Sequence, residues 1–509
     1  MKKQNIALID IGSNSIRLVI FGLDKQGFYK EVQNLKVVAR LSSHFNKDGN
    51  ITNKGITILL EALHHFQEIT RTYNVTKTKC VATAAIRQAK NQPKIISAVT
   101  EATDFEIRVL SEYEEAFFGY LAVTNSTNIE DGLTIDIGGG STEITLFKNR
   151  HLLHYHSFPF GAITLKQTFI KNELPTKQES TDLLLFLKEQ FSSLKWLEQN
   201  NLPVIGIGGS ARNLALISQA RTDYPLGGLH QYEMSYGNIE SITDDLKKLS
   251  FKQRQMVDGL SKDRADIIIP AAEAIFMFME VSGANQFIVS NKGLRDGLFY
   301  EELFQQLQID SFPNVAEESF YQLSQDYEVD IDNVKYISKL ATQLYYEFFP
   351  HFKHKLTDIN LRLLHLSCRV RYSGEHISYE SSSQHTFYIL TNLSIDGLTH
   401  IERLKIALIA SFKSKKALLS YLAPYKEWFD GEAVEKLEML GAILKFTDSL
   451  NITRQQSISN VRIVETNDTR ITLKLTCLLD AHFEEIQTQK YKKHLEKSLK
   501  KRIELLFSR

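Results

Sequence analysis

The chain has 509 residues, 43% of them hydrophobic and 24% charged, which predicts several ordinary globular domains rather than a single core. Lysine plus arginine and aspartate plus glutamate each number 60, so the net charge is zero and a polyanion must bind to a local basic patch. Three widely spaced cysteines exclude a disulfide framework and indicate a reducing cytoplasm. The apolar run Ile6–Ile9 is too short for a signal peptide, and no run approaches the ~20 apolar residues of a membrane span.

Two glycine-rich turns, each following a buried strand and opening with an aspartate, are the most informative motif. The first is Asp10–Ser15 and the second is Asp136–Glu143. Glycine permits positive φ and lets backbone N–H groups approach a ligand, and such turned amides form a concave anion site. The two turns therefore predict two phosphate hairpins that face each other across a cleft and bind a phosphate chain or a nucleotide.

Residues 1–122 and 123–302 show the same order of elements. In the first segment a hairpin is followed by a helix, short buried strands and a second helix over Glu112–Ala122. In the second a hairpin is followed by a strand, a long helix over Glu179–Gln199 and a strand that enters a glycine turn at Gly208. Alternating strands and helices with internal repetition predict a pair of similar α/β lobes.

Residues 303–450 are rich in helical patterns with Tyr, Phe and Leu, such as Tyr336–Phe349. Residues 451–509 begin with two alternating strands separated by a turn at Thr466–Thr469. The end of the chain, Lys490–Arg509, has the pattern of a basic amphipathic helix. Its first interpretation is a solvated helix that packs through its leucines, and the alternative is a binding surface for a long polyanion.

Seven segments together resemble the exopolyphosphatase and guanosine pentaphosphate phosphohydrolase (Ppx/GppA) family, within the superfamily of actin, sugar kinases and heat-shock chaperone ATPases. In chain order they are Asp10–Ser15, Ala82–Asn91, Leu110–Ala116, Asp136–Glu143, Phe158–Ala162, Gly206–Asn213 and Ser290–Gly297. One glycine motif alone would be a weak signal, whereas seven in the family's order are specific. Ile443–Leu450 resembles the last shared helix of the family's third domain, so the resemblance covers almost the whole chain.

The resemblance implies an α/β fold of two ribonuclease-H-like lobes, residues 1–122 and 123–302, with the active site between them. It further implies a helical domain similar to HD hydrolases at 303–450 and a small α/β domain at 451–509. Leu364–Gly374 contains no His-Asp pair, so we expect the helical domain to lack a metal site and an activity of its own. A cytoplasmic homodimer that binds neither nucleic acid nor a membrane is expected.

The resemblance assigns Glu115 as the catalytic base, and Arg87 offers a fork of donors for phosphate oxygens. Asp10, Asp136 and Glu143 are expected to hold Mg²⁺ directly or through water, with a monovalent cation such as K⁺ as a further ion. The expected phosphate-binding residues are Gly12, Ser13, Asn14, Ser15, Gly138, Gly139, Gly140, Ser141, Gly208, Gly209, Ser210, Arg212 and Arg295. Three simpler interpretations stay open: Arg87 as the partner of a surface carboxylate, Glu115 as a solvated acid in a first helical turn, and Glu143 as a hydrogen-bonding residue behind the metal.

These residues predict an exopolyphosphatase that releases terminal phosphate from inorganic polyphosphate. The alternative substrate is guanosine pentaphosphate (pppGpp), whose terminal phosphoanhydride would occupy the same hairpins, with ppGpp as its product. The domains beyond residue 303 favour the polymer, since a long chain needs surface beyond one cleft. From another class, a non-catalytic polyphosphate or alarmone sensor would release no phosphate, and in an actin-like ATP-binding module Glu115 would lack a purpose.

Overall fold

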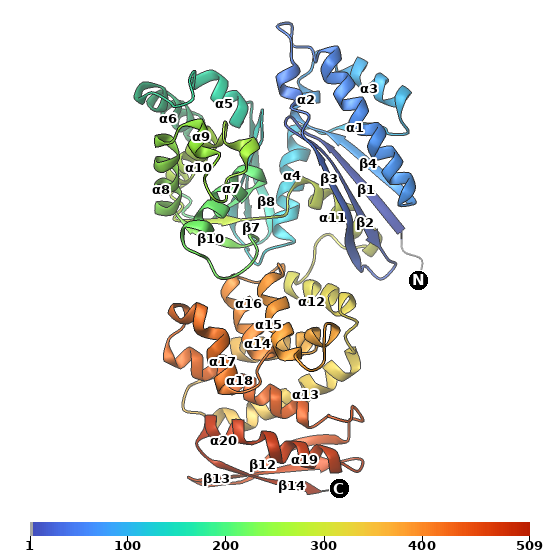
Figure 1. The fold of residues 1–509 in the computed structure, drawn as a ribbon, viewed down its shortest axis with the longest axis vertical. Helices are drawn as coiled ribbons and strands as arrows, with labels where there is room; N and C mark the ends of the chain where they lie inside the picture. Colours follow the sequence, from blue (N-terminus) through green and yellow to red (C-terminus); the bar gives the residue numbers. More distant parts are fainter. Residues whose placement is uncertain (1–3, 509) are drawn as a thin grey trace. The chain divides into compact units, whose positions relative to one another are not determined.

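The computed structural model describes residues 4–508, which divide into two compact units (Figure 1). The first unit is Met1–Tyr224 with Leu229–Val315, and the second is Pro225–Gly228 with Ala316–Arg509. The expected division into four parts at residues 122, 302 and 450 stays a prediction.

The first sheet has the strand order β3-β2-β1-β4-β5, with β1, β2 and β3 antiparallel and β1, β4 and β5 parallel. The strands are β1 (Gln4–Ile11), β2 (Ile16–Leu23), β3 (Tyr29–Val37), β4 (Val75–Ala82) and β5 (Ile107–Val109). Helices α1 (Asn53–Thr72) and α3 (Gln92–Ala102) pack on one face, while α4 (Glu112–Thr124) and α11 (Leu294–Leu307) pack on the other. Because both faces are covered, β1 carries the unbroken apolar run Ile6–Ile9 instead of an alternating pattern.

The second sheet repeats this arrangement. Its order is β10-β11-β9-β6-β7-β8, in which β6, β7 and β8 are antiparallel, and β6, β9 and β11 are parallel. The strands are β6 (Gly132–Ile137), β7 (Thr142–Lys148), β8 (His151–Phe158), β9 (Val204–Ile207), β10 (Tyr232–Ser235) and β11 (Gln286–Val289). Helices α5 (Ala162–Phe169), α6 (Lys177–Ser192), α7 (Gly208–Arg221), α8 (Tyr236–Lys248) and α10 (Ile268–Ser282) complete its core. In sheet order, β8-β7-β6-β9-β11 correspond to β3-β2-β1-β4-β5 of the first sheet. This correspondence confirms the predicted internal repeat of an α/β plan.

Two local predictions in the second lobe need correction. Helix α6 ends at Ser192 and not near Gln199, because Leu194–Leu197 form a turn that directs Leu197 into the core. The expected glycine turn after β9 is the first turn of α7. Gly208 has φ +81°, which favours glycine and permits the abrupt passage from strand to helix.

The second unit is helical up to Ser449 and then forms a small mixed sheet (Figure 1). Its helices are α12 (Val315–Asp326), α13 (Ile331–Phe348), α14 (Asp358–Val370), α15 (Ser382–Asn392), α16 (His400–Ala410), α17 (Lys415–Leu422) and α18 (Gly431–Ser449). The two predicted strands are confirmed as the antiparallel pair β12 (Ile458–Thr466) and β13 (Arg470–Cys477). The similarity of the helical part to HD hydrolases stays a prediction.

The predicted helix over Lys490–Arg509 is wrong in its second half. Helices α19 (His482–Tyr491) and α20 (Lys493–Leu499) are followed by β14 (Arg502–Ser508), which pairs in parallel with β13. Residues 503, 505 and 507 are less exposed than residues 502, 504 and 506, which is the two-residue period of a strand. Pairing with the edge of β13 stabilises this extended conformation. The ammonium of Lys492 donates to the carbonyl of Ile503 at 2.7 Å, and that of Lys501 to Asn467 at 2.7 Å, so two of the tail cations stabilise this sheet.

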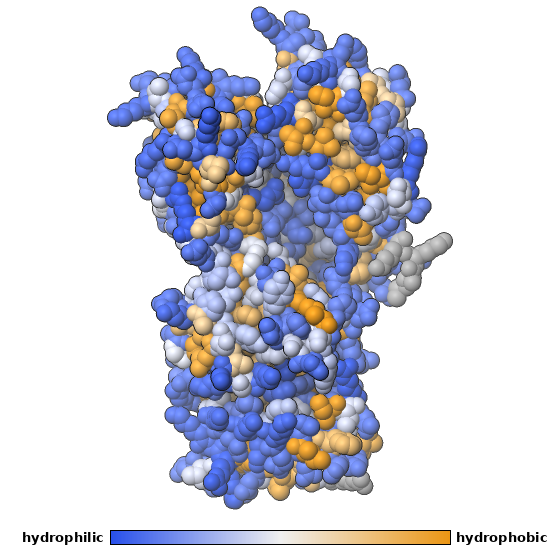
Figure 2. Space-filling view, in the orientation of Figure 1, coloured by the Kyte–Doolittle hydropathy of each residue, from blue (hydrophilic) through white to orange (hydrophobic). Residues whose placement is uncertain are grey.

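The face of the molecule seen in Figure 2 is mainly hydrophilic, with hydrophobic residues in scattered groups, as is usual for protein surfaces. None of the helices within residues 4–508 combines the length and apolar character that crossing a membrane requires.

Candidate active site

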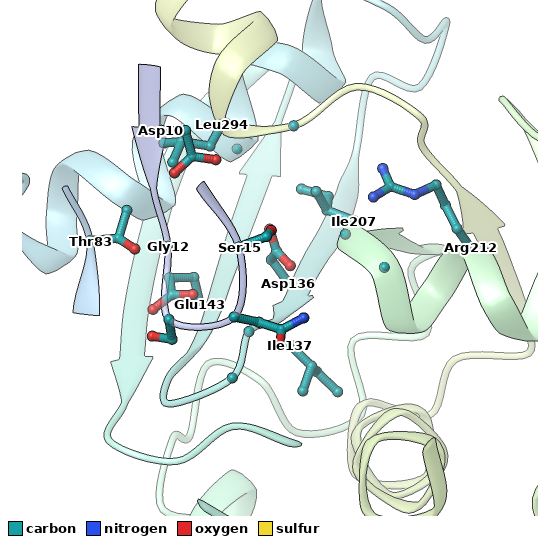
Figure 3. Close-up of a pocket in the computed structure, with 18 of the residues that line it drawn as sticks. Asp10, Gly12, Ser15, Thr83, Asp136, Ile137, Glu143, Ile207, Arg212 and Leu294 are labelled. Atoms are coloured by element: carbon teal, nitrogen blue, oxygen red, sulfur yellow. The ribbon is translucent and has the colours of Figure 1, made fainter. Parts of the chain in front are cut away.

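A cavity of about 380 Å³ is lined by residues of both lobes of the first unit (Figure 3). Asp10 is the last residue but one of β1 and Asp136 the last but one of β6, so equivalent positions of the two copies reach the same space. In both hairpins the glycine two residues later closes the turn: the amide of Gly12 donates to Ser15 O at 3.1 Å, and that of Gly138 to Ser141 O at 3.0 Å. The two hairpins are therefore copies in geometry as well as in sequence.

Close backbone packing holds the second hairpin in place. The first amides of α5 donate to its carbonyls, Ala162 N to Gly138 O at 2.9 Å and Ile163 N to Gly139 O at 3.0 Å. A Cβ on Gly161 would lie 2.6 Å from Gly138 O, so only glycine fits at the start of this helix. These hydrogen bonds preorganise the hairpin before any ligand arrives.

Most of the residues predicted for the site line this one cavity. They are Asp10, Gly12, Ser13, Asn14, Ser15, Glu115, Asp136, Gly138, Gly139, Ser141, Glu143, Gly208, Gly209, Arg212 and Arg295. Arg87, Gly140 and Ser210 are not among the described residues that line it. Ser210 Oγ instead accepts a hydrogen bond of 3.5 Å from Arg264 Nη1.

Arg87 lies behind Glu115. Its Nη1 donates to Glu115 Oε2 at 2.8 Å and to Leu110 O at 2.9 Å. Arg87 ends the short helix α2 (Ala84–Arg87), whereas Glu115 is in the first turn of α4, after the capping box of Ser111 and Glu114. This geometry indicates that Arg87 orients the Glu115 side chain and favours its ionised form. The predicted contact of Arg87 with phosphate stays a prediction.

The structure adds basic residues that the sequence analysis did not select. Arg17, Lys36 and Arg264 line the cavity together with the predicted arginines. Arg17 faces Asp10 across the β1–β2 pair, and its interruption of an apolar strand was a usable signal. Arg264 lies against Gly209 and comes from a short 3₁₀ helix that has no informative periodicity. Lys36 Nζ pairs with Asp263 Oδ2 at 3.1 Å and so joins the two lobes beside the cavity.

Three carboxyl groups of the site lie in surroundings that favour their neutral forms. Burial raises the pKa of Glu115 to about 7, although Arg87 acts in the opposite direction, and the charges of Asp136 and Asp10 raise it further. Burial also raises the pKa of Asp136, while Arg212 and Arg264 lower it. The pKa of Glu143 lies well above its usual range because of burial and the charge of Glu115. A base with a pKa near 7 is suited to proton transfer at neutral pH.

The carboxylates fit a Mg²⁺ ion that is shared with substrate. Within residues 4–508 no group of three or more His, Cys, Asp or Glu side chains could hold a metal by itself. Mg²⁺ usually binds one or two carboxylates together with substrate phosphates and water, and Asp10 and Asp136 can supply such a pair. Asp10 Oδ2 now pairs with Arg295 Nη1 at 2.9 Å, and Glu143 Oε1 accepts a hydrogen bond of 3.0 Å from Ser157. Glu143 therefore also fits the alternative role of a residue behind the metal.

The contact between Arg87 and Glu115 can be tested through pH dependence. Arg87→Ala removes the guanidinium that favours the ionised carboxylate, so the pKa of Glu115 should rise above about 7. The midpoint of the pH profile of kcat/KM should then move upward by about one unit or more. The midpoint of Arg87→Lys should lie between those of wild type and Arg87→Ala. Arg108→Ala, which removes the partner of the neighbouring Glu114, is the matched control. An equal loss of rate at all pH values would instead assign Arg87 to phosphate binding.

Known proteins are similar to this chain in sequence and in fold. A model of the Ppx/GppA phosphatase family matches residues 19–306, and a model of Ppx/GppA phosphatase domain III matches residues 315–497. The guanosine-5'-triphosphate,3'-diphosphate pyrophosphatase of Pseudoalteromonas atlantica is 25% identical over 522 residues, which cover 96% of this chain and 95% of that protein. The crystal structure of the Aquifex aeolicus member of the Ppx/GppA family is 27% identical, with a TM-score of 0.54 over 60% of this chain and 99% of that one. The crystal structure of an exopolyphosphatase from Cytophaga hutchinsonii is 22% identical to this chain and similar to it in fold, with a TM-score of 0.55 over 59% of this chain and 98% of that one.

Proposed function

Because the chain belongs to the Ppx/GppA phosphatase family, we propose that it is an exopolyphosphatase, which hydrolyses the terminal phosphoanhydride bond of inorganic polyphosphate. The observation that carries this proposal is the composition of the cavity. Two phosphate hairpins, five basic side chains and the candidate base Glu115 line it, and none of the described residues around it is aromatic. A nucleobase usually stacks on aromatic side chains, whereas a phosphate chain needs amides and cations.

In the proposed reaction Glu115 accepts a proton from the water that attacks the terminal phosphorus. The new bond joins the water oxygen to phosphorus, the bridging P–O bond breaks, and orthophosphate leaves a polyphosphate shortened by one unit. The amides of Ser13–Ser15, Gly139 and Ser141 bind the non-bridging oxygens, and Arg212 counters the charge of the leaving chain. Asp10 and Asp136 would hold Mg²⁺, which when bound neutralises charge on the phosphates.

Guanosine pentaphosphate is the second candidate substrate. The Pseudoalteromonas relative, named for hydrolysis of that nucleotide, matches nearly the whole chain, which supports this alternative. The position of Glu115 at the cavity argues against a non-catalytic sensor or an actin-like ATP-binding module, because neither needs a base there.

Phosphate release separates these functions. The purified protein should be incubated with Mg²⁺ and, in parallel, with long polyphosphate, guanosine pentaphosphate or ATP. We expect the highest kcat/KM for polyphosphate. Faster hydrolysis of the guanine nucleotide would assign the alternative substrate, preference for ATP would favour the actin-like ATP-binding module, and binding without release would favour a sensor.

We further propose a cytoplasmic homodimer whose helical domain is HD-like but has no hydrolase activity. The missing His-Asp pair in Leu364–Gly374 motivates the last point. The full-length Glu115→Gln variant should therefore hydrolyse neither a cyclic dinucleotide nor guanosine tetraphosphate in the presence of Mg²⁺ or Mn²⁺. Turnover of either compound by this variant would reveal a second active site and contradict the proposal.

A further inference from the structure

A second cavity, of about 440 Å³, adjoins the candidate active site in the first unit. The two cavities share three wall residues, Asn14, Asp263 and Ile267. The two cavities are therefore neighbours, with Asn14 of the first hairpin in the wall of both.

The hairpin itself fixes one wall of the second cavity. The amide of Arg40 donates to Asn14 O at 2.9 Å, and the amide of Ser42 donates to Ser13 O at 3.1 Å. Arg40 has φ +45°, which is uncommon for a residue other than glycine, and the hydrogen bond to Asn14 holds it there. The Arg40 side chain is thereby kept next to the phosphate hairpin.

The charges of this cavity favour an anion. Lys166 lies 4.0 Å from Asp266, and Asp263 is paired with Lys36, so the two acidic residues of the wall are compensated. Arg40 and Lys171 also line the cavity, and neither side chain forms an ion pair within 4.0 Å in the part of the chain that the structure describes. The Glu179 carboxylate accepts a hydrogen bond of 3.1 Å from the backbone amide of Lys171 and offsets part of the charge of that lysine. Arg40 and Lys171 are both exposed, so both cations can bind a ligand that enters from solvent.

The remaining walls suit a phosphate chain better than a nucleoside. They are formed by isoleucines and by the polar groups of Ser43 and Gln167, and no aromatic side chain occurs among the described lining residues. A purine would lose the stacking on aromatic side chains that stabilises bases in single-stranded nucleic-acid complexes. Phosphates would find two cations and several hydrogen-bond donors.

We propose that the second cavity is a subsite for the phosphates behind the terminal one, and that Arg40 and Lys171 confer preference for longer chains. This inference rests on the proposed exopolyphosphatase function and names which substrates that function favours: chains long enough to pass Asn14 and reach Arg40.

The test compares an Arg40→Gln/Lys171→Gln double variant with wild type on long polyphosphate and on tripolyphosphate. KM for the long chain should rise about tenfold or more, since two charge-assisted contacts are lost. kcat should be unchanged, and KM for tripolyphosphate should change less than about twofold. The increase should fade in 1 M salt, where the screening length is ~3 Å. A Lys177→Gln/Lys252→Gln variant removes the same charge from exposed positions of the first unit and is the control.

The outcomes separate the subsite from the activity. Suppose that wild type hydrolyses polyphosphate, but the double variant has an unchanged KM or a KM that rises equally for long polyphosphate and tripolyphosphate. The proposed subsite is then wrong, and the proposed activity stands. If wild type releases no phosphate, calorimetric titration with long polyphosphate decides, because equal affinity of both proteins would overturn the subsite as well. A KM increase for guanosine pentaphosphate as large as that for the long chain would also overturn it.

Discussion

Glu115→Gln should lower kcat for phosphate release by ~10²–10⁴-fold and leave KM for polyphosphate within about twofold of wild type. The amide keeps the shape of the carboxylate and can accept the hydrogen bond from Arg87, but it cannot take a proton from water. Initial rates at several polyphosphate concentrations give both parameters. Glu112→Gln, three residues earlier on the exposed side of α4, should behave as wild type. Near-normal turnover of Glu115→Gln would remove this residue from the role of base.

Glu115→Gln should not destabilise the folded protein, so that its loss of activity cannot be explained by unfolding. Glu115 has an unfolded pKa of 4.5, and burial raises its folded pKa to about 7. Below pH 4.5 the carboxyl is protonated in both states, whereas above pH 7 the folded protein must hold a buried charge. The penalty therefore grows as pH rises from 4.5 to 7, and Glu115→Gln removes it. The variant's Tm at pH 8 should be no lower than that of wild type, and kcat/KM of wild type should rise with pH through about 7.

The hairpins could be predicted from sequence because their signals are local. A buried strand, an aspartate and a glycine turn lie within ten residues in each copy, and the structure closes both turns with the same hydrogen bond. The internal repeat made the pairing of the lobes predictable as well, since Asp10 and Asp136 occupy equivalent strand ends.

The partners of the site residues could not be predicted, because they depend on how separate elements pack. The contact of Arg87 with Glu115 requires α2 and the start of α4 to meet, which no spacing in the sequence encodes. Arg264 reaches the cavity from a three-residue helix in the other lobe. At the end of the chain Leu495, Leu499 and Ile503 fit a helical period, yet Ile503 belongs to β14 because this segment pairs with the edge of β13. Tertiary packing decided each of these cases.

Loss of the Asp136 carboxylate should have the second large effect, on the need for Mg²⁺. Asp136 is half-buried and lies against Gly208, where any side chain would clash with this carboxylate. The charges of Arg212 and Arg264 also act on it. Asp136→Asn keeps the shape and removes the charge that a hard cation requires. The Mg²⁺ concentration for half-maximal rate should rise by more than the ~10–100-fold that loss of an outer partner of a metal ligand costs.

The companion substitutions rank the carboxylates of the site. Asp10→Ala should also raise the Mg²⁺ requirement, and because Asp10 is paired with Arg295, an ion must first displace that arginine. Glu143→Gln should raise it least, since burial and Glu115 favour the protonated form of Glu143 and Ser157 already donates to it. Asp182→Asn, on the exposed face of α6, is the control. Rates measured across a Mg²⁺ titration test all four variants, and curves that coincide with wild type for Asp10, Asp136 and Glu143 together would refute the metal assignment, leaving the arginines as the counter-charges to phosphate.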